Sequence, residues 1–260
     1  MTTHSRHPAF LSLQGGINFR DLGGVSTVDG RRLRQGKLLR SGSLHMLTAE
    51  DLEHLDTLPL TQIIDYRDPH EAQRSPDKLN DRASYLNAPA NPLTPYVDAK
   101  VTELNAATLN AMNGEQFMLQ LYRHLPFNNA AYHQLTGWLM QPFEGALLQH
   151  CAVGKDRTGV GCALTLFALG CDSHTVMEEY LLTHGMLSQV EAHLCETLGA
   201  ELNAQGRQNL TDIIAVRESY LAAALSAIHE RYASIDLWLE QEYQLTPQAR
   251  EALRSRLLEG

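Results

Sequence analysis

The amino-acid sequence predicts an α/β protein whose central, mostly parallel sheet is flanked by helices. Short apolar runs that suit buried strands, at residues 62–66 and 146–149, alternate with helical patterns. From Asp172 to the C-terminus only helix signals follow, which predicts a helical C-terminal part. No repeat, low-complexity tract or linker divides the chain, so we expect one domain over residues 1–260.

Start and stop signals place the elements in order. Residues 16–41 are expected to form loop and hairpin because glycine recurs through them. Thr48 can cap a helix that ends at Leu58, and Pro247 after Thr246 marks another helix start. The other expected elements are strands at 62–66, 84–87 and 146–149, a proline-rich loop at 88–98, and helices at 99–125, 129–140, 158–169, 178–188, 190–198, 211–232, 235–241 and 247–258.

Composition and charge limit what the chain can bind. Apolar residues make up 43% and charged residues 20%, which is typical of a globular protein with a packed core. The net charge of −9 argues against nucleic acid or an anionic membrane surface as a partner. An anionic substrate would therefore need local cations. One stretch is rich in basic residues, which would either attract such a substrate or form the solvated face of a hairpin. These residues are Arg31, Arg32, Arg34, Lys37 and Arg40.

Cysteine usage and the N-terminus indicate a cytoplasmic protein. The four cysteines, at 151, 162, 171 and 195, form no CxxC pair and no metal spacing, so we expect reduced thiols. Residues 1–10 are polar and lack the core of a signal peptide. No stretch approaches the roughly 20 apolar residues of a membrane span. The oligomeric state stays open.

One stretch carries the chemistry: His150-Cys151-Ala152-Val153-Gly154-Lys155-Asp156-Arg157-Thr158-Gly159. It lies between a predicted buried strand and a predicted buried helix, where backbone N–H groups and a helix N-terminus form a cradle for phosphate. Cys151 stands at the strand end. Arg157, six residues later, can face the same point and hold two phosphate oxygens. Because cysteines beside cations and helix N-termini favour the thiolate, we expect Cys151 to attack phosphorus and form a phosphocysteine.

We call residues 151–157 the phosphate loop. Thr158, just after it, can donate its hydroxyl to the sulfur and stabilise the departing thiolate. His150 is expected to order the loop from behind. The residues expected to bind the phosphate are Ala152, Val153, Gly154, Lys155, Asp156 and Arg157.

Three other interpretations explain less of this stretch. A Walker A loop needs Gly where Gln149 stands and Ser or Thr where Asp156 stands. A cysteine protease needs a distant His and an oxyanion site, and nothing marks them. A buried structural thiol accounts for Cys151 but not for the Lys, Asp, Arg and Thr that follow it.

The Cys-x5-Arg pattern with a following Thr resembles the signature of the protein tyrosine phosphatase superfamily. The form HCxxGKDRTG is similar to bacterial tyrosine and lipid phosphatases of the mycobacterial protein tyrosine phosphatase B type. Further segments resemble motifs of that family and occur in its order: Asn18–Gly24, Leu39–Gly42, Ile64–Arg67 and Val216–Leu221.

This resemblance implies a protein tyrosine phosphatase-like fold, with a helical lid at about residues 93–125. It implies hydrolysis of phosphotyrosine, with phosphoserine, phosphothreonine and phosphoinositides as further substrates. Cys151 would be the nucleophile and Arg157 the phosphate clamp, while Lys155 would reach toward the substrate or pair with a carboxylate. Thiolate and guanidinium chemistry needs no metal or other cofactor. The alternatives are a weak phosphate-binding pseudophosphatase, which the intact motif speaks against, and a phosphatase of phosphoinositides only.

The general acid is where this sequence departs from the family pattern. The family places an Asp shortly after the strand that corresponds to residues 84–87, but residues 88–92 contain no acid. Asp156 and Asp98 are the candidates, and we favour Asp156 because it adjoins the reacting atoms. The side chains expected to brace the site are Arg20, Asp21 and Asp65, together with Arg40, which would brace it or contact substrate.

Overall fold

The computed structural model describes residues 7–79, 82–92 and 105–260. Within this part of the chain the central sheet has the strand order β1-β3-β6-β4-β5. β1 runs antiparallel to β3, and the other neighbours are parallel, so the predicted mostly parallel sheet is confirmed. β2 and β7 pair separately. The strands are β1 (Arg20–Asp21), β2 (Arg32–Leu33), β3 (Leu38–Ser41), β4 (Leu60–Asp65), β5 (Ser84–Asn87), β6 (Ala146–His150) and β7 (Leu258–Glu259).

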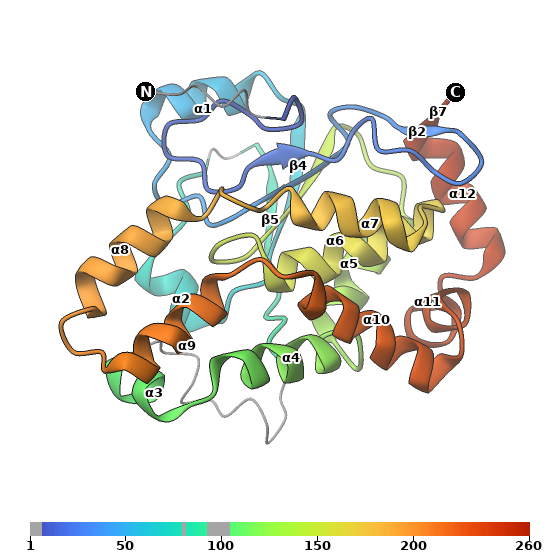
Figure 1. Ribbon diagram of the computed structural model, residues 1–260. Helices are drawn as coiled ribbons and strands as arrows, with labels where there is room; N and C mark the ends of the chain where they lie inside the picture. Colours follow the sequence, from blue (N-terminus) through green and yellow to red (C-terminus); the bar gives the residue numbers. More distant parts are fainter. Residues whose placement is uncertain (1–6, 80–81, 93–104) are drawn as a thin grey trace.

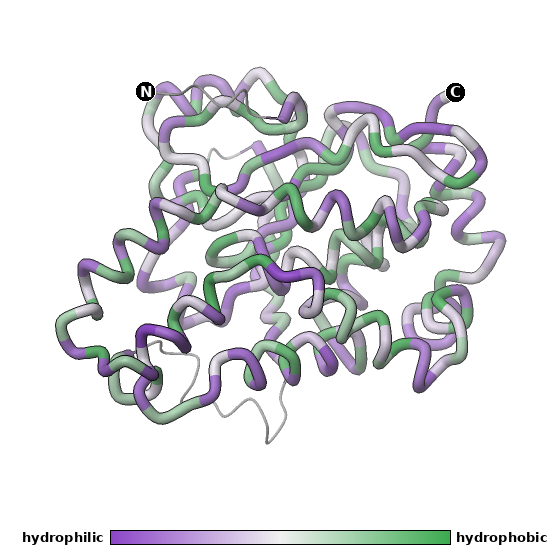
Figure 2. The backbone as a smooth tube through the Cα atoms, in the orientation of Figure 1, coloured by the Kyte–Doolittle hydropathy of each residue, from purple (hydrophilic) through white to green (hydrophobic). Residues whose placement is uncertain are grey.

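Helices surround this sheet (Figure 1). They are α1 (Ala49–Asp56), α2 (Pro69–Arg74), α3 (Ala106–Ala111), α4 (Gly114–His124), α5 (Ala130–Met140), α6 (Asp156–Leu169), α7 (Ser173–Leu181), α8 (Ser188–Leu198), α9 (Ala204–Ile214), α10 (Glu218–Tyr232), α11 (Ile235–Tyr243) and α12 (Pro247–Leu257). Outer helices such as α4 and α10 alternate between hydrophilic and hydrophobic residues in Figure 2, as helices with one buried face do.

Two hydrophobic layers cover the two faces of the sheet. Successive strand residues point to opposite faces. In β6, Leu147 therefore packs into the larger core with α5, α6 and α10 to α12, whereas Leu148 packs into the smaller core against α1. Ile64 and Ile63 of β4 divide in the same way. Because both faces are covered, β4 and β6 read as largely apolar runs, which is why the sequence revealed these two strands.

Capping residues start several helices where the sequence predicted. Thr48 accepts a hydrogen bond from the backbone N–H of Asp51 and completes a capping box at α1. Asn129 caps α5, and Thr246 caps α12 ahead of Pro247. The central helix α6 is buried along almost its whole length, and Gly170 ends it in the left-handed conformation with φ +94°.

Several predictions about the elements were wrong, among them the helix expected over 178–188, because α7 ends at Leu181. The helix expected over 211–232 is divided into α9 and α10, because residues 215–217 leave the helix and the carbonyl of Ala215 accepts a hydrogen bond from Lys155. The C-terminal part is not helical throughout, since β7 pairs with β2. The short helix α2 was not predicted; Pro69 and the capping residue Asp68 start it.

A satellite cluster joins α3, α8 and α9 at one end of the molecule (Figure 1). Its apolar contacts include Leu109 of α3, Leu198 of α8 and Leu210 of α9, so segments about a hundred positions apart in the chain lie side by side. Of the lid expected at 93–125, residues 93–104 lie outside the described residues, and the rest contains α3 and α4. The single domain over residues 1–260 and the lid itself stay predictions.

Replacing Leu164 by Ala should lower the free energy of unfolding by about 2–5 kcal/mol. Leu164 lies on α6 with 0% of its surface exposed, so the truncation leaves a cavity in the larger core. Urea unfolding followed by circular dichroism measures the effect. Leu237→Ala on α11 is the matched control, because that side chain is 40% exposed and should change stability little. Equal losses in both variants would contradict this account of the core.

Candidate active site

The phosphate loop connects the end of β6 to the start of α6. Gly154 takes a left-handed conformation with φ +68°, and a Cβ on it would lie 2.4 Å from the carbonyl carbon and oxygen of Ser41. Only glycine fits this close approach to the end of β3. Cys151 follows β6 directly and is only 1% exposed, so its thiol is almost enclosed at the carboxyl end of the central strand.

A buried cluster of charges braces the loop from one side. Glu179 on α7 accepts hydrogen bonds from Arg20 Nε at 2.7 Å and from Arg40 Nη1 at 2.6 Å. Arg40 Nη2 and Asn18 Nδ2 both donate to the carbonyl of Gly154, at 2.7 and 2.8 Å. Burial alone would raise the pKa of Glu179, but the two guanidinium groups hold it below its usual range. Arg40 thus touches the loop directly, and Arg20 acts through Glu179.

Asp21 takes no part in this brace, contrary to our expectation. Its carboxylate accepts hydrogen bonds from the backbone N–H groups of Gly23, at 2.8 Å, and Gly36, at 2.7 Å. Adjacent strand residues point to opposite faces, and Arg20 occupies the face toward the loop. Asp21 therefore stabilises the turns beside β1.

A second charged cluster lies behind the strand end. His150 Nδ1 is 3.7 Å from Asp65, and its Nε2 is 3.4 Å from Asp77. Arg67 Nη2 binds both carboxylates, at 2.8 and 2.5 Å. Burial lowers the pKa of His150, although the two carboxylates oppose that shift. The ligand atoms of His150, Asp65 and Asp77 lie within 4.8 Å of one another, but Arg67 already pairs with both carboxylates, so the arrangement fits ion pairing better than metal binding.

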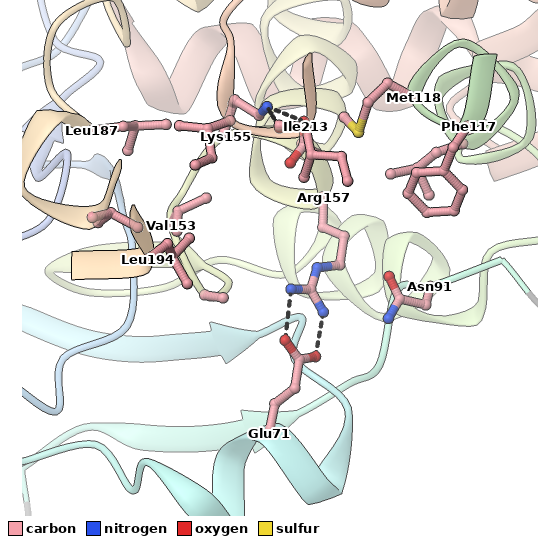
Figure 3. A pocket seen from close by; sticks show the side chains of 15 residues that line it. Glu71, Asn91, Phe117, Met118, Val153, Lys155, Arg157, Leu187, Leu194 and Ile213 are labelled. Atoms are coloured by element: carbon pink, nitrogen blue, oxygen red, sulfur yellow. Dashed lines mark hydrogen bonds and ion pairs between the residues drawn. The ribbon is translucent and has the colours of Figure 1, made fainter. Parts of the chain in front are cut away.

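Arg157 is held by Glu71 of α2 in a two-point ion pair (Figure 3). Its Nη1 lies 2.5 Å from Oε2 of Glu71, and its Nη2 lies 3.0 Å from Oε1. Burial would lower the pKa of Arg157, but its electrostatic interactions with Cys151 and Glu71 raise it above its ordinary value. Tyr132 donates its hydroxyl to the Arg157 carbonyl at 2.6 Å, which fixes the backbone here.

Of the two roles suggested for Lys155, the structure shows pairing with a carboxylate rather than a reach toward the substrate. Its ammonium group donates to the carbonyls of Ile213, at 2.5 Å, and Ala215, at 2.9 Å. It also lies 3.4 Å from Asp156. The side chain is 1% exposed, and burial lowers its pKa, with Asp156 opposing the shift. The carbonyls at the end of α9 attract the cation because they lack helical partners.

Asp156 opens α6 and accepts a hydrogen bond from an unforeseen partner. The hydroxyl of Tyr122 on α4 donates to Oδ1 of Asp156 at 2.8 Å and also lies 2.8 Å from the hydroxyl of Tyr180. Burial and the Asp156 charge raise the pKa of Tyr122 well above its usual value, so this phenol stays a donor. Asp98, the other candidate acid, lies outside the described residues.

Thr158 lies one residue beyond the phosphate loop on α6. Its side chain is 0% exposed, and its hydroxyl has no hydrogen-bond partner among the described residues. Buried hydroxyls are normally paired, and an unpaired one calls for an explanation. The hydroxyl is therefore free to donate a hydrogen bond to a negatively charged group that develops nearby during a reaction.

A cavity of about 180 Å³ opens above the phosphate loop. Arg157, Lys155 and Asp156 line its floor, and Figure 3 shows apolar side chains converging on it from α4 and α8. The apolar walls are Phe117, Met118, Leu121, Leu187, Val190, Leu194, Ile213 and Ile214. A small charged floor beneath apolar walls suits a phosphoryl group attached to an aromatic or aliphatic group.

Comparison with known proteins now decides the family. Residues 11–259 match the sequence profile of the tyrosine phosphatase family. The chain belongs to this family. The phosphatase is 33% identical over 250 residues to a Cupriavidus necator protein that bears the name of a tyrosine-protein phosphatase, covering 92% of this chain and 88% of that protein. It is 30% identical over 260 residues to the triple specificity protein phosphatase PtpB of Mycobacterium tuberculosis, covering 89% of this chain and 93% of PtpB.

The resemblance to the mycobacterial B type is thereby confirmed, and the chain is a cysteine-dependent phosphatase. The crystal structure of P. aeruginosa TpbA aligns with a TM-score of 0.30 and 15% identity, over 76% of this phosphatase and 89% of TpbA. In the described part of this phosphatase, no helix combines the length and apolar character needed to cross a membrane.

Sequence reasoning missed several residues of this site. Glu179 follows Val176 by three positions on the buried face of α7, and an acid within an apolar stripe signals a buried ion pair. Asn18 is the first residue of the segment Asn18–Gly24, which resembled a family motif, but the sequence suggested no role for this side chain. Glu71, Asp77 and Tyr122 carried no signal of their own, because their importance comes from partners between 10 and 86 positions away.

Glu179→Gln should lower the free energy of unfolding at pH 7 by about 3–5 kcal/mol, because two buried guanidinium groups lose their counter-charge. The pKa of Glu179 is lowered in the folded state, so its contribution is present above the unfolded value of about 4.3 and is lost as pH falls below it. The variant should therefore lose less stability than the wild type on acidification below about pH 4.

The matched control is Glu178→Gln on the same helix, whose side chain is 67% exposed. Denaturant unfolding at several pH values measures both variants. An unchanged pH dependence in Glu179→Gln would show that this carboxylate is not the ionised centre of the cluster.

Proposed function

We propose that this phosphatase hydrolyses phosphotyrosine, and also phosphoserine, phosphothreonine and phosphoinositides, through a phosphocysteine at Cys151. The observation that carries the proposal is the phosphate loop, in which an almost enclosed thiol and the Arg157 guanidinium lie on one strand-to-helix connection. The apolar walls of the cavity, from Phe117 to Ile214, suit the ring of phosphotyrosine.

Two steps account for the reaction. Sγ of Cys151 attacks phosphorus, the S–P bond forms as the ester P–O bond breaks, and Asp156 donates a proton to the leaving oxygen. Asp156 then takes a proton from water as that water attacks phosphorus, and the thiolate leaves. The unpartnered hydroxyl of Thr158 is our candidate donor to the departing sulfur. Neither step requires a metal or another cofactor.

Arg157 can hold phosphate without releasing Glu71. Glu71 binds the guanidinium end-on through Nη1 and Nη2, which leaves the edge formed by Nε and Nη2 for two phosphate oxygens. Glu71 therefore orients the phosphate clamp. We assign the remaining phosphate contacts to the backbone N–H groups of residues 152–156, at the N-terminus of α6.

We assign the general acid to Asp156 because of its place in the phosphate loop, with Tyr122 and Lys155 both at its Oδ1. Tyr122 binds Oδ1, so we assign the transferred proton to Oδ2. Asp156 also adjoins Arg157 in the chain and lines the same cavity. Since the acid lies within the phosphate loop, no movement of another loop is needed to bring it to the leaving oxygen.

Cys151→Ser should abolish turnover of an aryl phosphate, because a serine hydroxyl is hardly ionised at neutral pH. The variant should still bind vanadate or phosphate, since the loop backbone and Arg157 remain. Steady-state kinetics and calorimetric titration measure the two effects. Cys195→Ser is the control, because that cysteine is exposed on α8 and should leave turnover unchanged. Turnover by Cys151→Ser at the wild-type rate would rule out the phosphocysteine.

Asp156→Asn should cost little on an aryl phosphate with a very acidic phenol, and roughly 10²–10⁴-fold on an alkyl phosphate, whose leaving oxygen needs the proton. The high-pH limb of the rate profile should also flatten. Rates across a series of leaving groups measure the effect, with Asp98→Asn as the competing variant. If Asp98→Asn shows the leaving-group dependence instead, Asp98 is the acid.

A further inference from the structure

A second cavity, of about 510 Å³, adjoins the phosphate loop on the side of α2. We call it the side cavity. It shares Glu71, Ala152, Val153 and Val190 with the cavity above the loop, so the two spaces meet at the phosphate clamp. Its volume lies within the range of about 300–1,000 Å³ that is typical of ligand pockets. Nothing in the reaction described above uses it.

One arginine that lines the side cavity has no counter-charge, although the whole chain carries a net charge of −9. Glu71 is the only acid among the described residues that line it, and Glu71 is already paired with Arg157. Arg67 also lines it, but two carboxylates neutralise that guanidinium. Arg74 is different: it is exposed, and it has neither an ion pair nor a side-chain hydrogen bond with any described residue. The side cavity therefore offers one uncompensated cation.

The position of Arg74 relates it to the phosphate clamp. Arg74 follows Glu71 by three positions on α2, and residues with that spacing lie on the same face of a helix, with Cβ atoms about 5–6 Å apart. The uncompensated cation thus lies about one helical turn from the pair that orients Arg157. A substrate whose phosphoryl group is bound by Arg157 would bring its neighbouring groups to this place.

The rest of the lining indicates what kind of substrate fits. Neutral hydrogen-bonding groups and flexible apolar side chains make up most of the remaining lining of the side cavity, as suits an extended peptide. An inositol ring with several phosphates would need several free cations, whereas one arginine suits a single acidic group. The hydrogen-bonding side chains include Ser43, His45, Gln189 and His193, and the flexible apolar side chains are Met46 and Met186.

We propose that the side cavity is a specificity subsite that binds one acidic group of a phosphoprotein, next to the phosphorylated residue, with Arg74 as its anion contact. The acidic group is an Asp or Glu carboxylate or a second phosphate. This inference rests on the proposed function, because it takes the phosphate loop as the place where the scissile phosphoryl group binds.

Three phosphotyrosine peptides test the subsite: one with neutral flanks, one with Glu beside the phosphotyrosine, and one with phosphoserine there. The wild type should turn over the two acidic peptides with a kcat/KM about three- to tenfold higher than the neutral peptide, chiefly through KM. The advantage should shrink as salt is added. Arg74→Gln should remove it while leaving the neutral peptide and an aryl phosphate unchanged, and Arg74→Lys should keep part of it.

Arg32→Gln is the matched control, because Arg32 is also exposed but lines a different cavity, which has no lining residue in common with the side cavity. Equal rates for acidic and neutral peptides in the wild type would overturn the subsite, as would an equal loss on all substrates in Arg74→Gln. An effect of Arg74→Gln confined to a soluble phosphoinositide would assign the cavity to lipid headgroups and overturn the proposal. Failure of the wild type to hydrolyse the aryl phosphate would instead contradict the proposed function.

Discussion

The buried carboxylate of Glu179 between Arg20 and Arg40 is the interaction on which the geometry of the phosphate loop depends. Through Arg40 it reaches the carbonyl of Gly154, whose left-handed backbone brings the loop within contact of β3. Replacing a whole buried charge cluster by apolar residues often changes stability little, because desolvation offsets most of the attraction, whereas removing one partner alone is costly. Here the cluster fixes a position: the hydrogen bonds among Arg20, Arg40 and Glu179 hold the phosphate loop in one place against the sheet.

The site separates polar support from apolar enclosure. Behind the loop, the charged groups of β1, β3, β4 and α7 orient the backbone that carries Cys151. In front of it, apolar side chains of α4, α8 and α9 form the cavity walls. Lys155 joins the two parts, because its ammonium group binds carbonyls at the end of α9 and lies beside Asp156. The break between α9 and α10 therefore supplies the carbonyls that hold Lys155 beside the site.

Much of the fold was predictable because its signals are local. Buried strands such as 146–149 appear as apolar runs, and caps such as Thr48 mark helix starts within one turn. The errors came where a distant partner overrides the local pattern. The helix expected over 211–232 breaks where a cation from the phosphate loop takes its carbonyls, and β7 forms because β2 offers it an edge. Neither partner is visible within the segment itself.

The sequence by itself determined the family and predicted the chemistry, because Cys151, Arg157 and their neighbours occupy one continuous stretch whose spacing sets what they can do. Only the tertiary structure decided what surrounds them. Glu71 meets Arg157 across 86 positions of sequence, Glu179 meets Arg40 across 139, and Tyr122 meets Asp156 across 34. Such pairs form because packing brings side chains together in space, and no local pattern records which distant residue will arrive.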